Sequence, residues 1–233
     1  MTNSFDNLYS PLACAYIRGV SLRTGQPELP ASLLHTPLSA LSEEAITQIL
    51  CAGQQAQLKL YRFKPHDDLP RVRAVMGFLK AIYPDSLLDI GSGRGVFLNT
   101  FLSAFPYTSV TSLDILPHRV QALRDMAAGG VSQLTAFEQD LCTWDAPDKS
   151  FDVVTLLEVL EHIPDTASAI RAAVRLARRY VVVTVPSKPD DNPEHIHLLT
   201  KPILTELFHD AGCTSLSFGG VPGHLFMTAR IDP

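Results

Sequence analysis

Apolar and polar positions alternate in blocks from residue 68 onward, and these blocks predict helices and strands in turn. A helix is expected after Asp68 and Pro70, with an apolar stripe that includes Val72, Val75 and Leu79. Short apolar runs typical of strands follow at residues 86–90, 109–115, 134–138, 151–157 and 180–185. Helical spacing occupies the segments between and after them, at residues 96–105, 117–128, 165–179 and 200–210. This alternation predicts right-handed crossovers and a mainly parallel sheet.

Two of these strands are apolar on both faces. Residues 151–157 and 180–185 are nearly all apolar, which is typical of central strands that helices cover on both sides. The last two predicted strands, residues 213–218 and 224–230, are separated only by a glycine-rich turn, so we expect an antiparallel hairpin at one edge. The expected fold class is α/β: a doubly wound, mainly parallel, seven-stranded Rossmann-like sheet with an antiparallel last strand, plus an N-terminal helical cap.

The first 67 residues lack this alternation. Four prolines interrupt residues 1–40, which are expected to be irregular. A helical pattern begins at residues 42–44, whose acidic side chains suit a first turn, and continues to about Leu60. We therefore divide the chain into an N-terminal irregular segment with a helical cap or lid (1–67) and a larger domain (68–233).

Composition narrows the classes of function. Apolar residues make up 46% of the 233 residues, enough for a large core, and the formal net charge of −5 disfavours non-specific nucleic-acid binding. None of the 4 cysteines has a CxxC spacing, and the N-terminus lacks the basic start and apolar run of a signal peptide. The longest apolar runs are too short to span a bilayer. These features predict a reduced, cytoplasmic protein.

The most informative segment, residues 87–97, reads LLDIGSGRGVF and combines a strand, a glycine-rich turn and a helix. Ligands of open parallel sheets bind at such turns, although a turn that only needs flexible residues is the alternative. The glycine spacing is GxGxG, and Val96 stands where a dinucleotide site has Gly or Ala. Asp89 precedes the first glycine by two residues; a carboxylate there repels a pyrophosphate but can hold an ammonium group. Both features disfavour a nicotinamide oxidoreductase.

At this segment the chain resembles the class I S-adenosylmethionine-dependent methyltransferases, whose first motif is an acidic residue, a hydrophobe and GxGxG. The resemblance covers about residues 68–230. It implies S-adenosylmethionine as the cofactor, bound by Asp89 and by the glycine loop of Gly91, Gly93 and Gly95. Asp114, at the end of the second strand, is the expected ribose ligand because a carboxylate accepts both hydroxyls. By itself, Asp114 could as well cap the helix that follows it.

Two later segments extend the resemblance. Asp140 and Leu141 follow the third strand, where the family binds the adenine amino group with an Asp and covers the ring with the next residue. Residues 157–164 match the family's fourth motif, which lines the methyl-transfer pocket. The resemblance therefore implies that Asp140 and Leu141 bind the cofactor, and that Glu158 lies both at the cofactor and among the catalytic residues.

A methyltransferase aligns a nucleophile behind the methyl group and can also remove its proton. The candidate bases are Glu158, Glu161, His162, His195 and His197. His162 is preferred because imidazole titrates near neutral pH; a structural contact with the backbone is the alternative. The expected catalytic residues are His162, Glu158 and Glu161.

The spacing of Glu158, Glu161 and His162 has a second interpretation. Together with His195, these residues resemble the metal site of the small-RNA 3′-terminal 2′-O-methyltransferases, because one helical turn would gather the first three on one side. The same spacing also occurs in metal-free family members that act on quinones and other small molecules. No convincing RNA-binding segment is present, since four arginines in residues 171–179 are explained by a solvated helix face. We therefore expect no bound metal.

The sequence thus predicts an S-adenosylmethionine-dependent methyltransferase that acts on an oxygen or nitrogen atom of a small-molecule acceptor. We expect no nucleic-acid partner and no membrane span, and we expect the loop at residues 189–193 to shape the acceptor pocket. The alternatives are a metal-dependent RNA 2′-O-methyltransferase and a non-catalytic S-adenosylmethionine-binding protein. The identity of the acceptor and the oligomeric state stay open.

Overall fold

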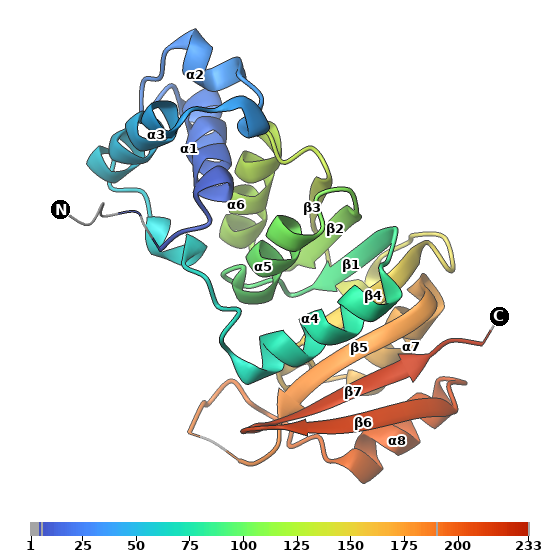
Figure 1. The fold of residues 1–233 in the computed structure, drawn as a ribbon. Coiled ribbons are helices and arrows are strands. Elements are labelled where there is room, and N and C mark those ends of the chain that lie inside the picture. The colour runs from blue at the N-terminus through green and yellow to red at the C-terminus, as the bar shows by residue number, and fades with distance from the viewer. Residues whose placement is uncertain (1–4, 6, 190, 233) are drawn as a thin grey trace.

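The computed structural model describes residue 5 and residues 7–189 and 191–232. Within these residues, seven strands form one sheet in the order β3-β2-β1-β4-β5-β7-β6 (Figure 1). The strands are β1 (Ser86–Ile90), β2 (Ser109–Asp114), β3 (Leu134–Glu138), β4 (Phe151–Leu157), β5 (Ala177–Pro186), β6 (Ser215–Val221) and β7 (His224–Arg230). The first five run parallel, whereas β7 is antiparallel to both β5 and β6. The predicted fold class, including the hairpin at the edge, is confirmed.

Helices cover both faces of the sheet, so each strand divides its side chains between two cores. Leu87 and Val153 belong to the core under α4 (Pro70–Ile82), α5 (Val96–Ala104) and α6 (Pro117–Ala128). Leu88 and Val154 belong to the core under α7 (Thr166–Leu176) and α8 (Lys201–Asp210). The strand order reverses between β1 and β4. The carboxyl ends of these two strands therefore form the switch point at which such sheets bind ligands.

The expectation that residues 1–40 are irregular is wrong for the part that the structure describes. These residues contain the helices α1 (Ser10–Thr24) and α2 (Ala31–His35) and the 3-10 turn η1 (Leu38–Ala40). Pro11 lies in the first turn of α1, where its missing N–H costs no hydrogen bond, and Gly25 ends the helix with a φ of 74°. The other prolines come after Gly25, so none of them interrupts α1.

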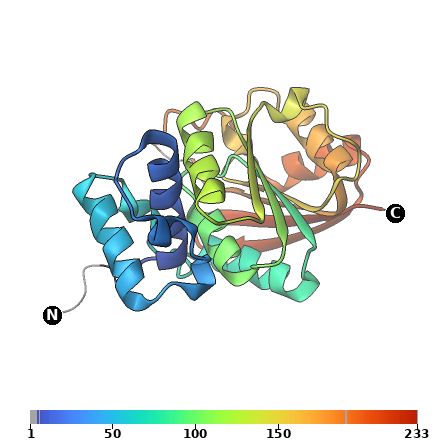
Figure 2. The same ribbon diagram turned by 90° about the horizontal axis from the view of Figure 1, so that it is seen from above.

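Helix α1 packs against α6, and the other N-terminal helices share the core on that face of the sheet (Figure 2). They include α3 (Glu43–Gln55) and the 3-10 turn η2 (Leu60–Phe63). At the contact of α1 with α6 the backbones touch: a Cβ atom on Gly19 would lie 1.8 Å from the backbone oxygen of Asp125. Arg23 of α1 also donates from Nε and Nη2 to the two carboxylate oxygens of Asp125, at 2.8 Å each. The boundary after residue 67 and a lid function stay predictions.

Several element ends differ from the prediction. α7 ends at Leu176 and β5 begins at Ala177, because Ala177 pairs with Phe151 of β4. Asp68 does not cap α4; Leu69 holds that position, and the backbone oxygen of Asp68 accepts a hydrogen bond from Arg73. β6 begins two residues later than expected, at Ser215. Asp190, in the loop at residues 189–193, lies outside the described residues.

Among the helices of the described residues, none has both the length and the apolar character needed to cross a membrane.

Candidate active site

A cavity of about 230 Å³, here called the methyl-transfer cavity, lies at the carboxyl ends of β1 and β4. Five of the predicted site residues line it: Asp89, Gly91, Gly93, Glu158 and His162. The rest of its wall consists of Arg71, Val72, Val75, Ser92, Arg94, Val96, Phe97, Arg119, Leu157 and Thr184. The other predicted residues do not belong to this wall; they are Gly95, Asp114, Asp140, Leu141 and Glu161. The structure therefore brings the first motif and part of the fourth motif to one space.

The three glycines of the loop between β1 and α5 have different steric reasons for their identity. All have positive φ, at 63° for Gly91, 58° for Gly93 and 83° for Gly95. A Cβ atom on Gly91 would lie 2.8 Å from Val159, and one on Gly95 would lie 2.9 Å from the side chain of Asn99. A Cβ atom on Gly93 would have no neighbour nearer than 3.7 Å, so this backbone faces open space. Gly93 is thus the position at which a ligand can approach the main chain closely.

Asp89 lies in the wall of this cavity and is only 2% exposed. Its Oδ1 accepts a hydrogen bond from Thr155 Oγ1 at 2.7 Å, and its Oδ2 accepts one from Ser92 Oγ. Burial raises the pKa of Asp89 to about 6, and these two hydrogen bonds oppose part of the rise. A buried carboxylate in this setting fits the ammonium group of a ligand.

Asp114 contacts the residue before α6 but does not cap that helix, whose N-cap is Leu116 without a side-chain cap. Its Oδ1 accepts a hydrogen bond at 2.9 Å from the backbone N–H of Leu116, the residue before α6. Its Oδ2 lies 3.4 Å from the N–H of Gly93 and 3.7 Å from Nη1 of Arg119. The ribose contact stays a prediction. Arg119 lines the cavity beside Gly93. The sequence did not predict it as a site residue, because it lies in an ordinary helical pattern.

Asp140 and Leu141 follow β3, as the resemblance requires, and have unlike surroundings. Asp140 is exposed and caps the 3-10 turn η3 (Leu141–Thr143), with its Oδ1 accepting from Cys142 N at 2.8 Å. Leu141 is 4% exposed and belongs to the core under α7 and α8. Their roles toward adenine stay predictions.

Glu158 is held at the end of β4 by Thr184 of β5 and His224 of β7. Its φ is 58°, and its backbone N–H donates to the oxygen of Thr184 at 2.9 Å. Its Oε1 accepts a hydrogen bond from Thr184 Oγ1 at 2.8 Å, and its Oε2 lies 2.9 Å from Nε2 of His224. His224 was missed because it is 66 positions away, and only the pairing of β7 with β5 places it there.

Glu161, His162 and His195 form a second polar group next to Glu158. One potential ligand atom from each lies within 4.8 Å of the others, and Glu161 is buried. His162 Nδ1 lies 2.9 Å from the backbone oxygen of Glu194, and the His162 and His195 rings are 4.8 Å apart in an edge-on arrangement. One carboxylate and two imidazoles suit a divalent transition metal.

The structure does not gather Glu158, Glu161 and His162 on one helical turn, as the predicted metal alternative requires. The 3-10 turn η4 begins at Leu160, after Glu158, and the left-handed backbone of Glu158 directs this residue toward Thr184 and His224. His197 is also separate, with Nε2 at 3.3 Å from the oxygen of Pro164. The expectation that no metal is bound stays a prediction.

Comparison with known proteins establishes the family. A family model described as a methyltransferase domain matches residues 61–217, which include every predicted site residue. The chain belongs to the methyltransferase family. The buried Asp89 beside the open Gly93 backbone fits S-adenosylmethionine as the cofactor.

A curated relative of this methyltransferase is the ubiquinone biosynthesis O-methyltransferase of Pseudomonas paraeruginosa. The two are 34% identical over 119 residues, which is 50% of this chain and 50% of the relative. The chain thus spans about half the length of the curated relatives it matches.

Solved structures share the fold at low identity. The magnesium protoporphyrin IX methyltransferase of Synechocystis PCC 6803, with bound SAH, matches with a TM-score of 0.56 and 19% identity, over 70% of this chain and 82% of its own. The [4+2]-cyclase SpnF matches with a TM-score of 0.57 and 16% identity, over 69% of this chain and 80% of its own. One fold therefore carries proteins named for different reactions, so the acceptor must be argued from the site.

Proposed function

We propose that the enzyme methylates an oxygen or nitrogen atom of a small molecule, with oxygen favoured. The methyl-transfer cavity carries this proposal, because Asp89 and Gly93, which suit the cofactor, share it with Glu158 and His162, which suit an acceptor. The preference for oxygen is supported by the curated relative, which is named an O-methyltransferase. A small-molecule acceptor is supported by the same relative, which is named for ubiquinone biosynthesis.

The proposed cofactor site uses residues from the ends of four strands, β1 to β4. Asp89 pairs with the ammonium group, and the backbone of Gly91, Gly93 and Gly95 accommodates the amino-acid part. Asp114 accepts the ribose hydroxyls through Oδ2, the oxygen that the Leu116 N–H does not occupy. The adenine is proposed to contact Asp140 and Leu141, and Glu158 closes the site on the β4 side.

The proposed catalytic group consists of His162, Glu158 and Glu161. Bound S-adenosylmethionine supplies an electrophilic methyl group. Because the Glu194 carbonyl can only accept a hydrogen bond, Nδ1 of His162 carries the proton and Nε2 retains a lone pair for the acceptor's proton. Glu161, buried beside both imidazoles, stabilises the positive charge that His162 gains. Glu158 is fixed by Thr184 and His224 and orients the acceptor hydroxyl.

A metal-dependent RNA 2′-O-methyltransferase is the second candidate, and the group of Glu161, His162 and His195 is the observation that favours it. The arginines of residues 171–179 favour the small-molecule proposal instead. Arg175 donates to the backbone oxygens of Ala146 and Trp144 and pairs with Asp148, while Arg178 pairs with the buried Asp152. These guanidinium groups have structural partners, which makes them poor phosphate ligands.

The test uses S-adenosylmethionine with a labelled methyl group and two acceptors of the same shape, catechol and 1,2-diaminobenzene. We expect label in catechol, with a mass increase of one methylene group, and much less in the diamine. Label in the diamine alone would reverse the preference for oxygen. An RNA oligonucleotide with a free 3′ end, tested with and without Mn²⁺, is the third acceptor, and metal-dependent label there would favour the RNA candidate. Tight cofactor binding without transfer to any acceptor would favour a non-catalytic protein.

A further inference from the structure

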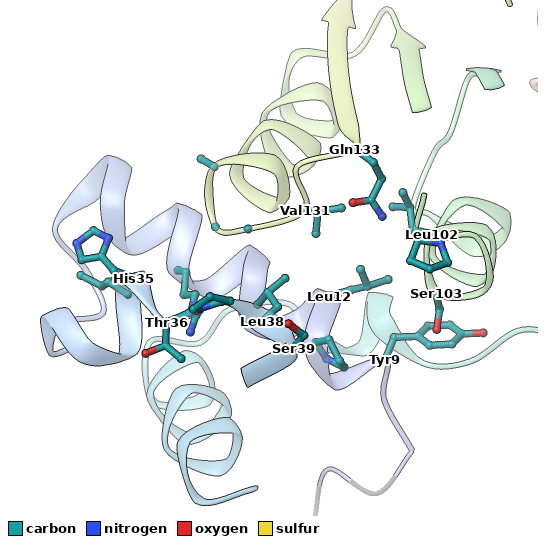
Figure 3. A pocket seen from close by; sticks show the side chains of 18 residues that line it. Tyr9, Leu12, His35, Thr36, Leu38, Ser39, Leu102, Ser103, Val131 and Gln133 are labelled. Atoms are coloured by element: carbon teal, nitrogen blue, oxygen red, sulfur yellow. The ribbon is translucent and has the colours of Figure 1, made fainter. Parts of the chain in front are cut away.

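A second cavity, of about 620 Å³, lies between the N-terminal helices and the ends of α5, α6 and β3; we call it the N-terminal cavity (Figure 3). Its apolar wall includes Leu12, Leu38, Leu102 and Val131, which Figure 3 shows around one space. Polar groups, among them Gln133, lie at intervals between them. The cavity therefore suits a ligand with an apolar body and a few polar atoms.

The N-terminal cavity is separate from the methyl-transfer cavity. The two share no lining residue. Helix α5 connects them: Val96, at its N-terminal end, lines the methyl-transfer cavity, whereas Leu102 and Ser103, near its C-terminal end, line the N-terminal cavity. A helix of 9 residues is about 14 Å long. A ligand in the N-terminal cavity would therefore not occupy the site of methyl transfer.

Arg18 of α1 is the unusual residue in the wall of the N-terminal cavity. Its side chain is buried, with the whole residue 1% exposed, and its Nη1 donates to the backbone oxygen of Thr36 at 2.8 Å. Nε and Nη2 have no hydrogen-bond partner in the described part of the chain. The nearby Cys14 provides no opposite charge, because burial raises the pKa of its thiol to about 12. A buried guanidinium with two unpaired nitrogen donors is costly, so a missing partner is indicated.

The neighbouring Arg23 shows what kind of partner this edge of a guanidinium binds. It uses the same two atoms, Nε and Nη2, to donate to both oxygens of the Asp125 carboxylate at 2.8 Å each. The planar fork of an arginine matches a carboxylate in this two-point manner. Arg18 presents the same edge without a carboxylate.

We propose that the N-terminal cavity binds a small amphipathic carboxylate, whose two oxygens pair with Nε and Nη2 of Arg18. The apolar body of the ligand lies against Leu12, Leu38 and Val131. Because both nitrogen atoms are shielded from solvent, part of the wall must shift to admit the ligand. The segment from α2 to η1 is suited to this movement, since neither element contains a buried residue.

The experiment measures hexanoate binding by calorimetry to the full chain saturated with S-adenosylhomocysteine, so that the cofactor site is occupied. We expect one saturable site, and at least tenfold weaker binding of 1-hexanol, which has the same body without the charge. Arg18→Met should lower the affinity for hexanoate at least tenfold. Arg230→Met, which removes an exposed arginine at the end of β7, should leave it unchanged.

Ser103→Trp provides an independent variant that keeps Arg18. Ser103 is exposed at the cavity, so the indole is expected to obstruct the cavity without disturbing the core, and hexanoate binding should be lost. Absence of saturable hexanoate binding to the original chain would overturn the proposal. Equal binding of hexanol and hexanoate, or unchanged affinity in a folded Arg18→Met or Ser103→Trp variant, would overturn it as well.

Discussion

The two cavities contain buried groups of opposite charge, the Asp89 carboxyl and the Arg18 guanidinium. The two groups differ in how the cost of burying their charge can be reduced. Asp89 in the methyl-transfer cavity accepts hydrogen bonds from two hydroxyls, whereas Arg18 in the N-terminal cavity has one bond, to a backbone oxygen. A buried carboxyl can avoid the desolvation cost of its charge by binding a proton, which is why burial raises the pKa of Asp89 to about 6. A guanidinium stays charged, so only an added anion or a structural change can relieve Arg18. The comparison predicts a pH-dependent site at one end of α5 and a ligand-dependent site at the other.

The largest expected effect separates the two cavities by activity. His162→Ala should lower turnover by about 10²–10⁴-fold because the acceptor's proton loses its base. Affinity for S-adenosylmethionine and for hexanoate should hardly change. Steady-state kinetics and calorimetry measure these quantities, with His209→Ala on the exposed side of α8 as the control. Near-normal turnover would reassign His162 to a structural role.

Asp89→Asn tests the charge at the methyl-transfer cavity. The amide keeps the shape of the side chain but cannot pair as an anion with the ammonium group. We expect cofactor affinity to fall by about 10- to 100-fold, or about 1–3 kcal/mol. Calorimetry measures this loss, and Asp148→Asn, at an exposed ion pair, is the matched control. If the affinity of Asp89→Asn equals that of the original chain, Asp89 does not bind the ammonium group.

The pH dependence of binding tests the same carboxyl without a mutation. The pKa of Asp89 in the ligand-free protein is raised from 3.8 to about 6, so its contribution to stability is full below pH 4 and is lost as pH rises through 6. The proposed ammonium contact requires the ionised form, so affinity should weaken about fivefold between pH 6 and pH 5, as the ionised fraction falls from about one half to about one tenth. Titrations across this range should show the slope in the original chain. The Asp89→Asn variant should lack this component, and equal slopes in both would contradict the assignment.

Substitution of the two arginines of α1, Arg23 and Arg18, should have smaller effects, and these should change stability in opposite directions. Arg23→Met leaves the buried Asp125 without its fork, which should lower Tm by about 2–8 °C, corresponding to about 1–2 kcal/mol. Arg18→Met removes a buried charge with two unpaired donors, so Tm without ligand should stay the same or rise, by about 1 kcal/mol in stability. Thermal unfolding followed by circular dichroism compares the two. A fall for Arg18→Met as large as that for Arg23→Met would show that Arg18 is satisfied within the protein.

The smallest expected effect concerns metal. We expect the purified protein to carry no tightly bound ion. Glu158 is engaged by Thr184 and His224, so among the described residues the potential ligand group contains Glu161, His162 and His195 without Glu158. Elemental analysis measures the metal content directly. Stoichiometric metal that disappears in His195→Ala but persists in His197→Ala would contradict this expectation and favour the RNA candidate.

The sheet was predictable because burial on both faces makes strands such as residues 151–157 apolar along their length, a signal that is local in sequence. Helix α1 was not, since Pro11 and the following prolines suggested a break. Its stability comes from packing against α6, a contact that joins residues about a hundred positions apart. Local propensity is a weak guide where tertiary contacts decide.

The candidate site likewise contains residues that a local motif predicts and residues that only tertiary structure brings together. Asp89 and the glycine loop lie in one continuous motif, so their proximity follows from one strand and one turn. The spacing of Glu158, Glu161 and His162 suggested one helical turn, but the left-handed backbone of Glu158 breaks that geometry. His224 and Arg119 reach the site only through strand pairing and helix placement, which no local spacing encodes.

The backbone contact between α1 and α6 limits how this chain can be recombined with others. A Cβ atom on Gly129, at the end of α6, would lie 1.8 Å from the backbone oxygen of Ala15, as close as the approach at Gly19. A chimaera that joins residues 1–67 to another member of the family would bring only one side of this contact. The recipient's α6 would need glycine at the position of Gly129 and a flat surface opposite Gly19. The N-terminal helices can therefore be transferred to another protein only together with α6. A chimaera joined at the loop after residue 67 should fail to pack these helices against the recipient's α6.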